Sequence, residues 1–261
     1  MTVSLPSSAR RAAPEVRRIT DADLTWALSE GWRDFNAKRG DVVVVAFLYP
    51  LMALVAAAVT MNDRLVPLFF PLVAGLSIMG PAVAAGFYEI ARRREEGLDS
   101  SWRHFLDPLG GRGRGPLVAL TLMLLGVFVA WLAVAWAIYA VTLGQRAPTD
   151  LIDFARLTVT TPEGWAMIGL GNLAGLGFAA LTLVLTVVSF PMTVDRPVTP
   201  DAAVGASLRA FGRNPGVLSR WGLRVALLLA LGSLPLFLGL PVVLPVLGYA
   251  TWHLYTRLVV R

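Results

Sequence analysis

Glu89 and His253 are the best candidates for chemistry in this 261-residue sequence. Each lies near one end of an apolar stretch long enough to cross a membrane, where an ionisable group is a functional candidate by default. A carboxylate beside an imidazole could relay a proton or hold a ligand. The alternative is structural, because Glu89 can also pair with Arg92 or Arg93 on its own helix. We favour this structural role, and both interpretations stay open.

The residue inventory removes several kinds of site. The chain has no cysteine, so disulfides, thiolate metal sites and a cysteine nucleophile are excluded. Its two histidines, His104 and His253, are too few for a histidine-built metal cage. The glycine-rich run at 110–115 does not match a phosphate-binding loop, and no hydrolase or dinucleotide motif is present. We therefore predict no catalytic residue, no metal and no cofactor, and a protein that is not an enzyme.

The stretch from Pro67 to Arg94 sets the orientation of the chain. Its first ~21 residues carry no charge, which is enough to cross a hydrocarbon core about 30 Å thick. It then ends in the triplet Arg92, Arg93 and Arg94. Three adjacent guanidinium groups are costly in lipid, so we expect this end at the cytoplasmic headgroups.

Composition supports a body embedded in lipid. The chain is 56% hydrophobic and 15% charged, whereas soluble domains carry about 25% charged residues. The net charge of +6 comes almost entirely from arginine, with Lys38 as the single lysine. Because the arginines lie between apolar runs, we expect them to contact anionic headgroups of the lipid bilayer and no nucleic acid.

The apolar stretches predict an all-α integral membrane protein with six transmembrane helices arranged as three hairpins. The expected spans are approximately 42–61, 67–90, 117–142, 165–190, 218–236 and 239–257. In this layout 19 basic residues fall on the side of both termini, and only Arg64, Arg146 and Arg156 fall on the other. That bias predicts cytoplasmic termini. Residues 1–18 are expected to be a disordered basic tail, and residues 19–261 a single membrane domain.

Two segments on the cytoplasmic side have the pattern of amphipathic helices. After a helix start at Thr20, Leu24, Leu28, Trp32 and Phe35 share one face. This helix either lies in the membrane interface or packs, as a soluble helix, on the inner ends of the spans. A second such helix begins near Thr199. The side chains expected to anchor the protein at headgroup level are Trp32, Phe35, Trp102, Phe105, Phe211 and Trp252.

The sequence also contains a candidate internal repeat. The pattern Pro-Leu-x-x-Gly-Leu-x4-Pro occurs at 71–81 and again at 235–245, and the same offset aligns Glu89 with His253. A shorter echo, Trp-Arg-x-Phe, precedes two of the hairpins, and Leu-Arg-Ala-Phe precedes the third. We infer a threefold parallel repeat, in which each unit is an interfacial helix followed by two spans. Chance matching in proline- and leucine-rich spans is the alternative.

Four segments of the chain also carry a family resemblance. They are RRITDADLTWALSEGWRDF, FPLVAGLSIMGPAVAAGFYEIARRREEG, VVSFPMTVDR and PVLGYATWHLY. Together they resemble a proteobacterial family of predicted integral membrane proteins, known as domain of unknown function family 2189. The resemblance extends from about 17 to 257. It implies a bacterial inner-membrane location and an all-helical fold, and it supplies no substrate, reaction or catalytic residue.

Two functions fit these observations. The first is a non-enzymatic scaffold, assembly factor or accessory subunit that contacts other inner-membrane proteins or itself. It follows from the lack of catalytic motifs and from the aromatic-rich helices that could dock partners. The alternative is a small-solute or ion transporter or channel, with a path near Glu89 and His253. An intramembrane enzyme ranks third.

Overall fold

The structure, a computed structural model, describes residues 14–37, 67–111, 113–146, 151–235 and 238–261. Within these ranges the regular secondary structure is helical, apart from an isolated bridge between Val16 and Val259. The α-helices are α1 (Asp21–Ala37), α4 (Phe69–Gly75), α5 (Gly80–Glu95), α6 (Arg114–Val141), α7 (Leu151–Thr160), α8 (Pro162–Thr186), α9 (Ser189–Asp195), α10 (Pro200–Arg213), α11 (Pro215–Ser233) and α12 (Leu240–Leu258). Short 3-10 helices are η3 (Leu76–Met79), η4 (Trp102–His104), η5 (Asp107–Leu109) and η6 (Leu143–Arg146).

Four of the described helical segments are long and apolar enough to cross a membrane. They are Phe69–Glu95, Arg114–Val141, Pro162–Asp195 and Pro215–Ser233. These segments overlap four of the six expected spans, so the prediction of an all-helical membrane protein is confirmed at this level. The expected span 42–61 lies outside the described residues. Helix α12 covers the last expected span but is not among the four, because tyrosine, tryptophan, histidine and arginine lower the hydropathy of its second half.

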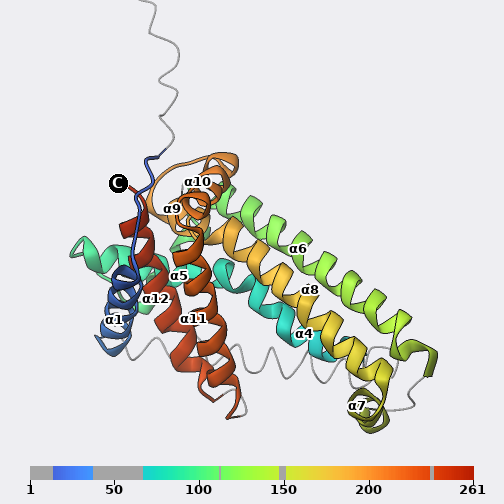
Figure 1. The fold of residues 1–261 in the computed structure, drawn as a ribbon. Coiled ribbons are helices and arrows are strands. Elements are labelled where there is room, and N and C mark those ends of the chain that lie inside the picture. Colours follow the sequence, from blue (N-terminus) through green and yellow to red (C-terminus); the bar gives the residue numbers. More distant parts are fainter. Residues whose placement is uncertain (1–13, 38–66, 112, 147–150, 236–237) are drawn as a thin grey trace, which may run out of the picture.

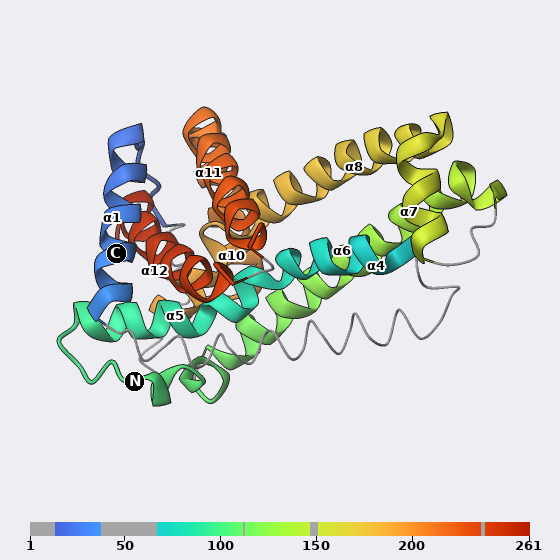
Figure 2. The same ribbon diagram turned by 90° about the horizontal axis from the view of Figure 1, so that it is seen from below.

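The ends of the apolar helices gather at one end of the molecule. Helix α10 contacts α6, α8, α9 and α11, and α9 also contacts the side of α5. In Figures 1 and 2, α7 lies at the opposite end, beyond the start of α8. We call these the α10 end and the α7 end. Residues at the α10 ends of different spans therefore lie close to one another, although they are far apart in the sequence.

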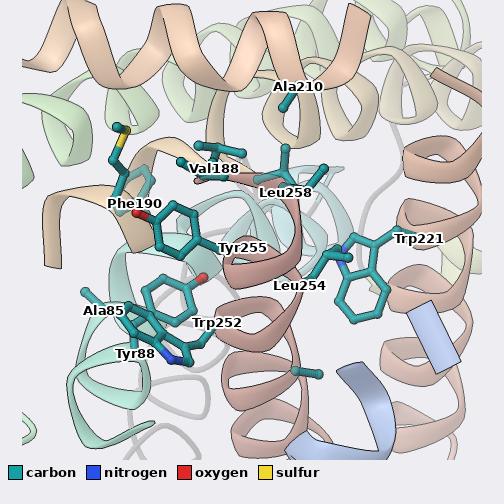
Figure 3. Close-up of a cluster of buried hydrophobic side chains, with 14 of the residues drawn as sticks. Ala85, Tyr88, Val188, Phe190, Ala210, Trp221, Trp252, Leu254, Tyr255 and Leu258 are labelled. Atoms are coloured by element: carbon teal, nitrogen blue, oxygen red, sulfur yellow. The ribbon is translucent and has the colours of Figure 1, made fainter. Parts of the chain in front are cut away.

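Close packing is concentrated at the α10 end. Figure 3 shows Tyr88, Phe190, Trp252 and Tyr255 converging there from α5, α9 and α12. Phe190, Trp252 and Tyr255 have no exposed surface, and Tyr88 is 2% exposed. Burying one large apolar side chain contributes roughly 1.5–3 kcal/mol, so this cluster contributes substantially to the stability of the contacts between α5, α9 and α12.

Toward the α7 end the helices leave large apolar side chains on the outside. Only 22% of the apolar window of α6 is buried. Exposed leucines on α6, α8 and α11 include Leu122, Leu125, Leu170, Leu173, Leu176, Leu223, Leu227 and Leu231. A surface of this kind is unfavourable in water but suits contact with acyl chains, which are as apolar as leucine.

Two of the apolar segments are irregular, and polar side chains bond to the backbone near the irregularities. Helix α8 gives way to α9 at Val187 and Val188, shortly before Pro191. The amide of Val188 donates to the hydroxyl of Ser207 on α10, at 3.3 Å. On α4, which continues into η3 and α5, the carbonyl of Pro71 accepts from the indole of Trp131 on α6, at 2.8 Å. Irregular backbone at membrane depth is tolerated where the protein supplies such partners.

Helix α1 packs lengthwise on α12 (Figure 1). Its buried residues are Leu24, Ala27, Gly31, Asp34 and Phe35. A Cβ atom on Gly31 would lie 2.7 Å from the carbonyl oxygen of Val246 and the amide nitrogen of Ala250, so only glycine allows this approach. Helix α1 therefore packs closely along α12. The buried face is rotated from the expected one, because small residues let the two helices come closest, and Trp32 remains 51% exposed.

The segment before α1 pairs with the end of the chain. Besides the bridge between Val16 and Val259, the amide of Arg17 donates to the carbonyl of Leu258 at 2.8 Å. The side chain of Asn214 then accepts from the amide of Ile19 and donates to the carbonyl of Arg17, both at 2.9 Å. Tertiary contacts thus begin before residue 19, earlier than the expected boundary of the tail. Residues 1–13 lie outside the described residues.

Candidate functional site

Glu89 is held by two arginines of its own helix. Its Oε1 accepts from Nη2 of Arg92 and from Nε of Arg93, each at 2.7 Å, and its Oε2 accepts from Nε of Arg92 at 2.9 Å. The side chain of Glu89 is 8% exposed. A nearly buried carboxylate needs this degree of charge compensation, because its desolvation would otherwise be prohibitive. Arg93 also donates to Asp107, at 2.9 Å, which ties α5 to η5.

His253 pairs with a carboxylate on α1 and not with Glu89. Its Nε2 lies 2.8 Å from Oδ2 of Asp34 on α1, and Nε of Arg94 lies 3.3 Å from Oδ1 of the same carboxylate. The indole of Trp26 meets the imidazole edge-on, with ring centroids 5.7 Å apart. The expected pair between Glu89 and His253 is therefore corrected: α5 and α12 do pack together, but each of the two residues has a different partner. Asp34 was missed because it forms its contacts only when α1 lies on α12.

A second carboxylate links the last residues of the chain to α9. Asp195 accepts from the hydroxyl of Tyr255 at 2.7 Å and from Nε of Arg196 at 3.1 Å. Nη2 of Arg196 lies 3.4 Å from the hydroxyl of Tyr255 and 3.3 Å from the carbonyl oxygen of Val260. Glu95 on α5 accepts from the indole of Trp252 at 3.2 Å, and it also pairs with Arg261. Thus charged groups tie α5, α9 and α12 together around the aromatic core.

A cleft of about 660 Å³ opens beside Glu89, between α5, η5, the start of α6 and the end of α9. Its charged lining consists of Glu89, Arg92, Arg93, Asp107, Asp195 and Arg196. Its apolar lining includes Leu106, Leu117 and Val194, and three glycines of the loop before α6 complete the wall. Among the described lining residues three guanidinium groups face three carboxylates, so this part of the cleft is polar and formally neutral, with an apolar border.

The loop between α5 and α6 has its own charged cluster. The carboxylate of Asp99 accepts from the amide of Ser101 at 3.0 Å and pairs with Arg103, and His104 lies 3.3 Å away. The amide of Ser101 is the main cause that lowers the pKa of Asp99 to about 2. His104 also contacts Asp107, with 2.7 Å between Nδ1 and Oδ2. These contacts fix the loop that forms one wall of the cleft.

The six expected headgroup anchors divide into two groups. Trp32 and Trp102 are 51% and 62% exposed, and Phe105 and Phe211 are partly buried. Phe35 and Trp252 lie instead in the core, 7% and 0% exposed, and so cannot reach lipid headgroups. Their apolar surfaces are needed to fill the contacts of α1 and α5 with α12. Sequence periodicity alone does not reveal which aromatic face another helix covers.

The polar residue within the fourth span has a local role. Asn172 lies on the exposed side of α8, and its amide donates to the carbonyl of Ile168 in its own helix at 2.8 Å. Of the glycines around it, Gly175 faces Trp131, and a Cβ atom added there would lie 3.6 Å from the indole ring. A Cβ atom on Gly171 would meet nothing within 4 Å among the described residues. Within that part of the chain no neighbouring backbone approaches Gly171 closely enough to require glycine.

Metal binding has no visible basis in the described ranges, where no three His, Asp or Glu residues gather as a ligand set. What the arrangement can do is hold charge at the α10 end and offer guanidinium N–H groups to a ligand in the cleft.

One comparison with known proteins finds a matching family model. Residues 69–195 match the model of a family described as "Predicted integral membrane protein (DUF2189)". Searches of curated proteins and of solved structures find no match to the chain.

Proposed function

We propose a non-enzymatic protein of a bacterial inner membrane, a proposal supported by the match of residues 69–195 to the family model of predicted integral membrane proteins DUF2189. Its role would be that of a scaffold, assembly factor or accessory subunit in a larger membrane complex. Its proposed topology has six spans in three hairpins, with both termini in the cytoplasm. The proteobacterial origin, the parallel repeat and the headgroup contacts of Trp32, Trp102, Phe105 and Phe211 belong to the same proposal.

The observation that carries the scaffold role is the use made of charged side chains at the α10 end. Glu89, Asp34, Asp195 and Glu95 each have an arginine partner, and the last three link segments that are distant in sequence. Such groups hold helices in place, whereas a proton relay needs groups that exchange partners. A rigid group of helices at the inner ends of the spans is better suited to docking another protein than to carrying out a reaction.

The distribution of arginine supports the orientation. Arg92, Arg93, Arg94 and Arg196 lie at the α10 end. At the α7 end the described arginines are Arg146 and Arg156, and carboxylates pair with arginines at both ends. An excess of arginine marks the cytoplasmic side of short loops.

Single-cysteine labelling tests the topology directly, because the chain has no cysteine of its own. We expect Ser101→Cys to resist a membrane-impermeant maleimide in intact cells and to react after lysis. Thr160→Cys, near the end of α7, is the matched control and should react in intact cells. Labelling of Ser101→Cys from outside would overturn the proposed orientation.

Co-purification in mild detergent tests the scaffold role. We expect a partner protein at a fixed stoichiometry, identified by mass spectrometry, that is lost when the exposed Trp102 and Leu106 are both replaced by serine. Replacement of the exposed Leu173 and Leu176 on α8 by alanine is the control and should leave the ratio unchanged. A homogeneous particle without any partner at fixed ratio would argue against the scaffold.

Transport is the second candidate, and the cleft beside Glu89 is the observation that favours it. In proteoliposomes a transporter would accelerate the flux of a small solute or ion, and Glu89→Gln would abolish that flux while the protein remains folded. The control is Glu30→Gln, on α1 and outside the cleft. Flux that is equal with and without protein would leave the scaffold as the supported function.

A further inference from the structure

We propose that the cleft beside Glu89 binds a phosphate group, carried either by a phospholipid headgroup or by a small soluble phosphate ester. This site goes beyond the scaffold role and does not depend on it. It is built from the residues that lead out of three apolar segments at the α10 end: Arg92 and Arg93 of α5, Leu117 of α6 and Arg196 after α9.

The donor count of the cleft favours an anion. A guanidinium group carries five N–H donors. Arg196 uses Nε on Asp195 and Nη2 on Tyr255 and Val260, while its Nη1 has no hydrogen-bond partner among the described residues. Arg93 makes one bond from each of its three nitrogens, so one N–H on each Nη is left over. The formal charges of the described lining balance, and the N–H groups left over in it lie on Arg93 and Arg196.

The type of donor suits an oxyanion with several acceptor oxygens, such as phosphate. Guanidinium groups are planar forks that match the oxygens of phosphate in bidentate fashion. The existing ion pairs hold these forks in place before a ligand arrives. Because Arg93 is fixed by Glu89 and Asp107, little side-chain entropy would be lost on binding.

The depth and the border of the cleft suit a lipid headgroup in particular. Apolar helices α5, α6 and α8 with α9 all reach the bilayer surface around it in the proposed topology. Leu106, Leu117 and Val194 line its apolar side, where the glycerol and the first methylenes of a phospholipid would lie. A soluble phosphate ester would use the same arginines without this apolar contact.

Native mass spectrometry of the delipidated, detergent-solubilised protein tests the site, with phosphatidylglycerol as the lipid probe and phosphatidylcholine as a competitor. Phosphorus NMR line broadening of inorganic phosphate is the second arm. We expect Arg196→Gln to weaken retention of phosphatidylglycerol at least about tenfold, since a charge-assisted hydrogen bond is lost. Arg33→Gln, on an arginine that is 67% exposed and outside the cleft, should behave as the parent chain.

A steric variant keeps the test independent of folding. Gly111 is exposed at the wall of the cleft, and a Cβ atom there would lie 3.6 Å from its nearest contact, so Gly111→Leu is tolerated and narrows the opening without removing charge. We expect it also to weaken binding. Binding of phosphatidylglycerol alone assigns the site to lipid, and binding of inorganic phosphate as well assigns it to phosphate in general. Retention unaffected by both Arg196→Gln and Gly111→Leu, or no binding of either probe, would overturn the proposal.

Discussion

Asp34 and His253, 219 residues apart, meet at 2.8 Å between Oδ2 and Nε2 and join α1 to α12. The carboxylate is 8% exposed and is also paired with Arg94 of α5, so one buried group connects three helices. These contacts hold α1, the first described helix, against α12, the last one.

Replacing Asp34 by alanine should loosen α1. The change leaves Arg94 and His253 without their shared acceptor, which costs roughly 1–3 kcal/mol. We expect a lower unfolding temperature in detergent and faster hydrogen exchange over Leu24 to Phe35. Glu30→Gln, which breaks an exposed pair with Arg33, is the control and should change stability by less than about 0.5 kcal/mol. Equal behaviour of both variants would contradict the role given to Asp34.

Gly31→Ala should separate α1 from α12. The added methyl group would lie 2.7 Å from backbone atoms of Val246 and Ala250, which cannot move without displacing a helix. Alanine ordinarily stabilises a helix by about 1 kcal/mol over glycine, so a loss of stability here would be diagnostic. At Gly212 the new methyl group would meet nothing within 4 Å among the described residues, and Gly212→Ala should be neutral or stabilising. Thermal unfolding of both variants measures the difference.

Two asparagines, one buried and one exposed, give a matched comparison. Asn214 is 5% exposed and bonds to Arg17, Ile19 and Ala210, so Asn214→Ala should destabilise the chain by about 1–3 kcal/mol. Asn172 is exposed and bonds within its own helix, so Asn172→Ala should have little effect. Chemical denaturation monitored by tryptophan fluorescence tests this. A larger loss at Asn172 would show that a neighbour outside the described residues uses it.

Trp131 should be one of the most sensitive positions within the apolar spans. It is 7% exposed, packs against Phe178 with ring centroids 5.6 Å apart, and donates to the carbonyl of Pro71. Trp131→Ala should cost about 3–5 kcal/mol, because it leaves a large cavity and an unsatisfied carbonyl. Trp131→Phe should cost less, since it removes mainly the hydrogen bond. Trp136→Ala, at a residue that is 44% exposed, serves as the control in the same unfolding assay.

Acidification should release the loop between α5 and α6 only at very low pH. The pKa of Asp99 is lowered in the folded chain to about 2, so its contribution to stability is present above its ordinary value near 3.8 and is lost as the pH falls through about 2. We expect the fluorescence of the nearby Trp102 to stay constant from about pH 7 to about pH 4 and to change below it. Asp99→Asn should remove this transition, and an unchanged titration in that variant would contradict the assignment.

Hydropathy and charge determined the membrane-embedded class, the four spans that the structure describes and the end at which Arg92 to Arg94 lie. These features depend on the free energy of transferring whole segments into lipid. That free energy is a sum over consecutive residues, so it can be estimated from the sequence alone. The helix starts at Thr20 and Thr199 were equally local, because a cap needs only neighbouring residues.

The tertiary structure alone decided which distant groups meet. The pairing of Glu89 with Arg92 and Arg93 is local and follows from their spacing on one helix. His253 pairs with Asp34, because the rotation of α1 and α12 about their axes is set by close packing at Gly31 and Gly248. In the same way Trp252 and Phe35 are buried because another helix covers them. Contacts between distant segments depend on shape complementarity of both partners, and neither partner carries that information by itself.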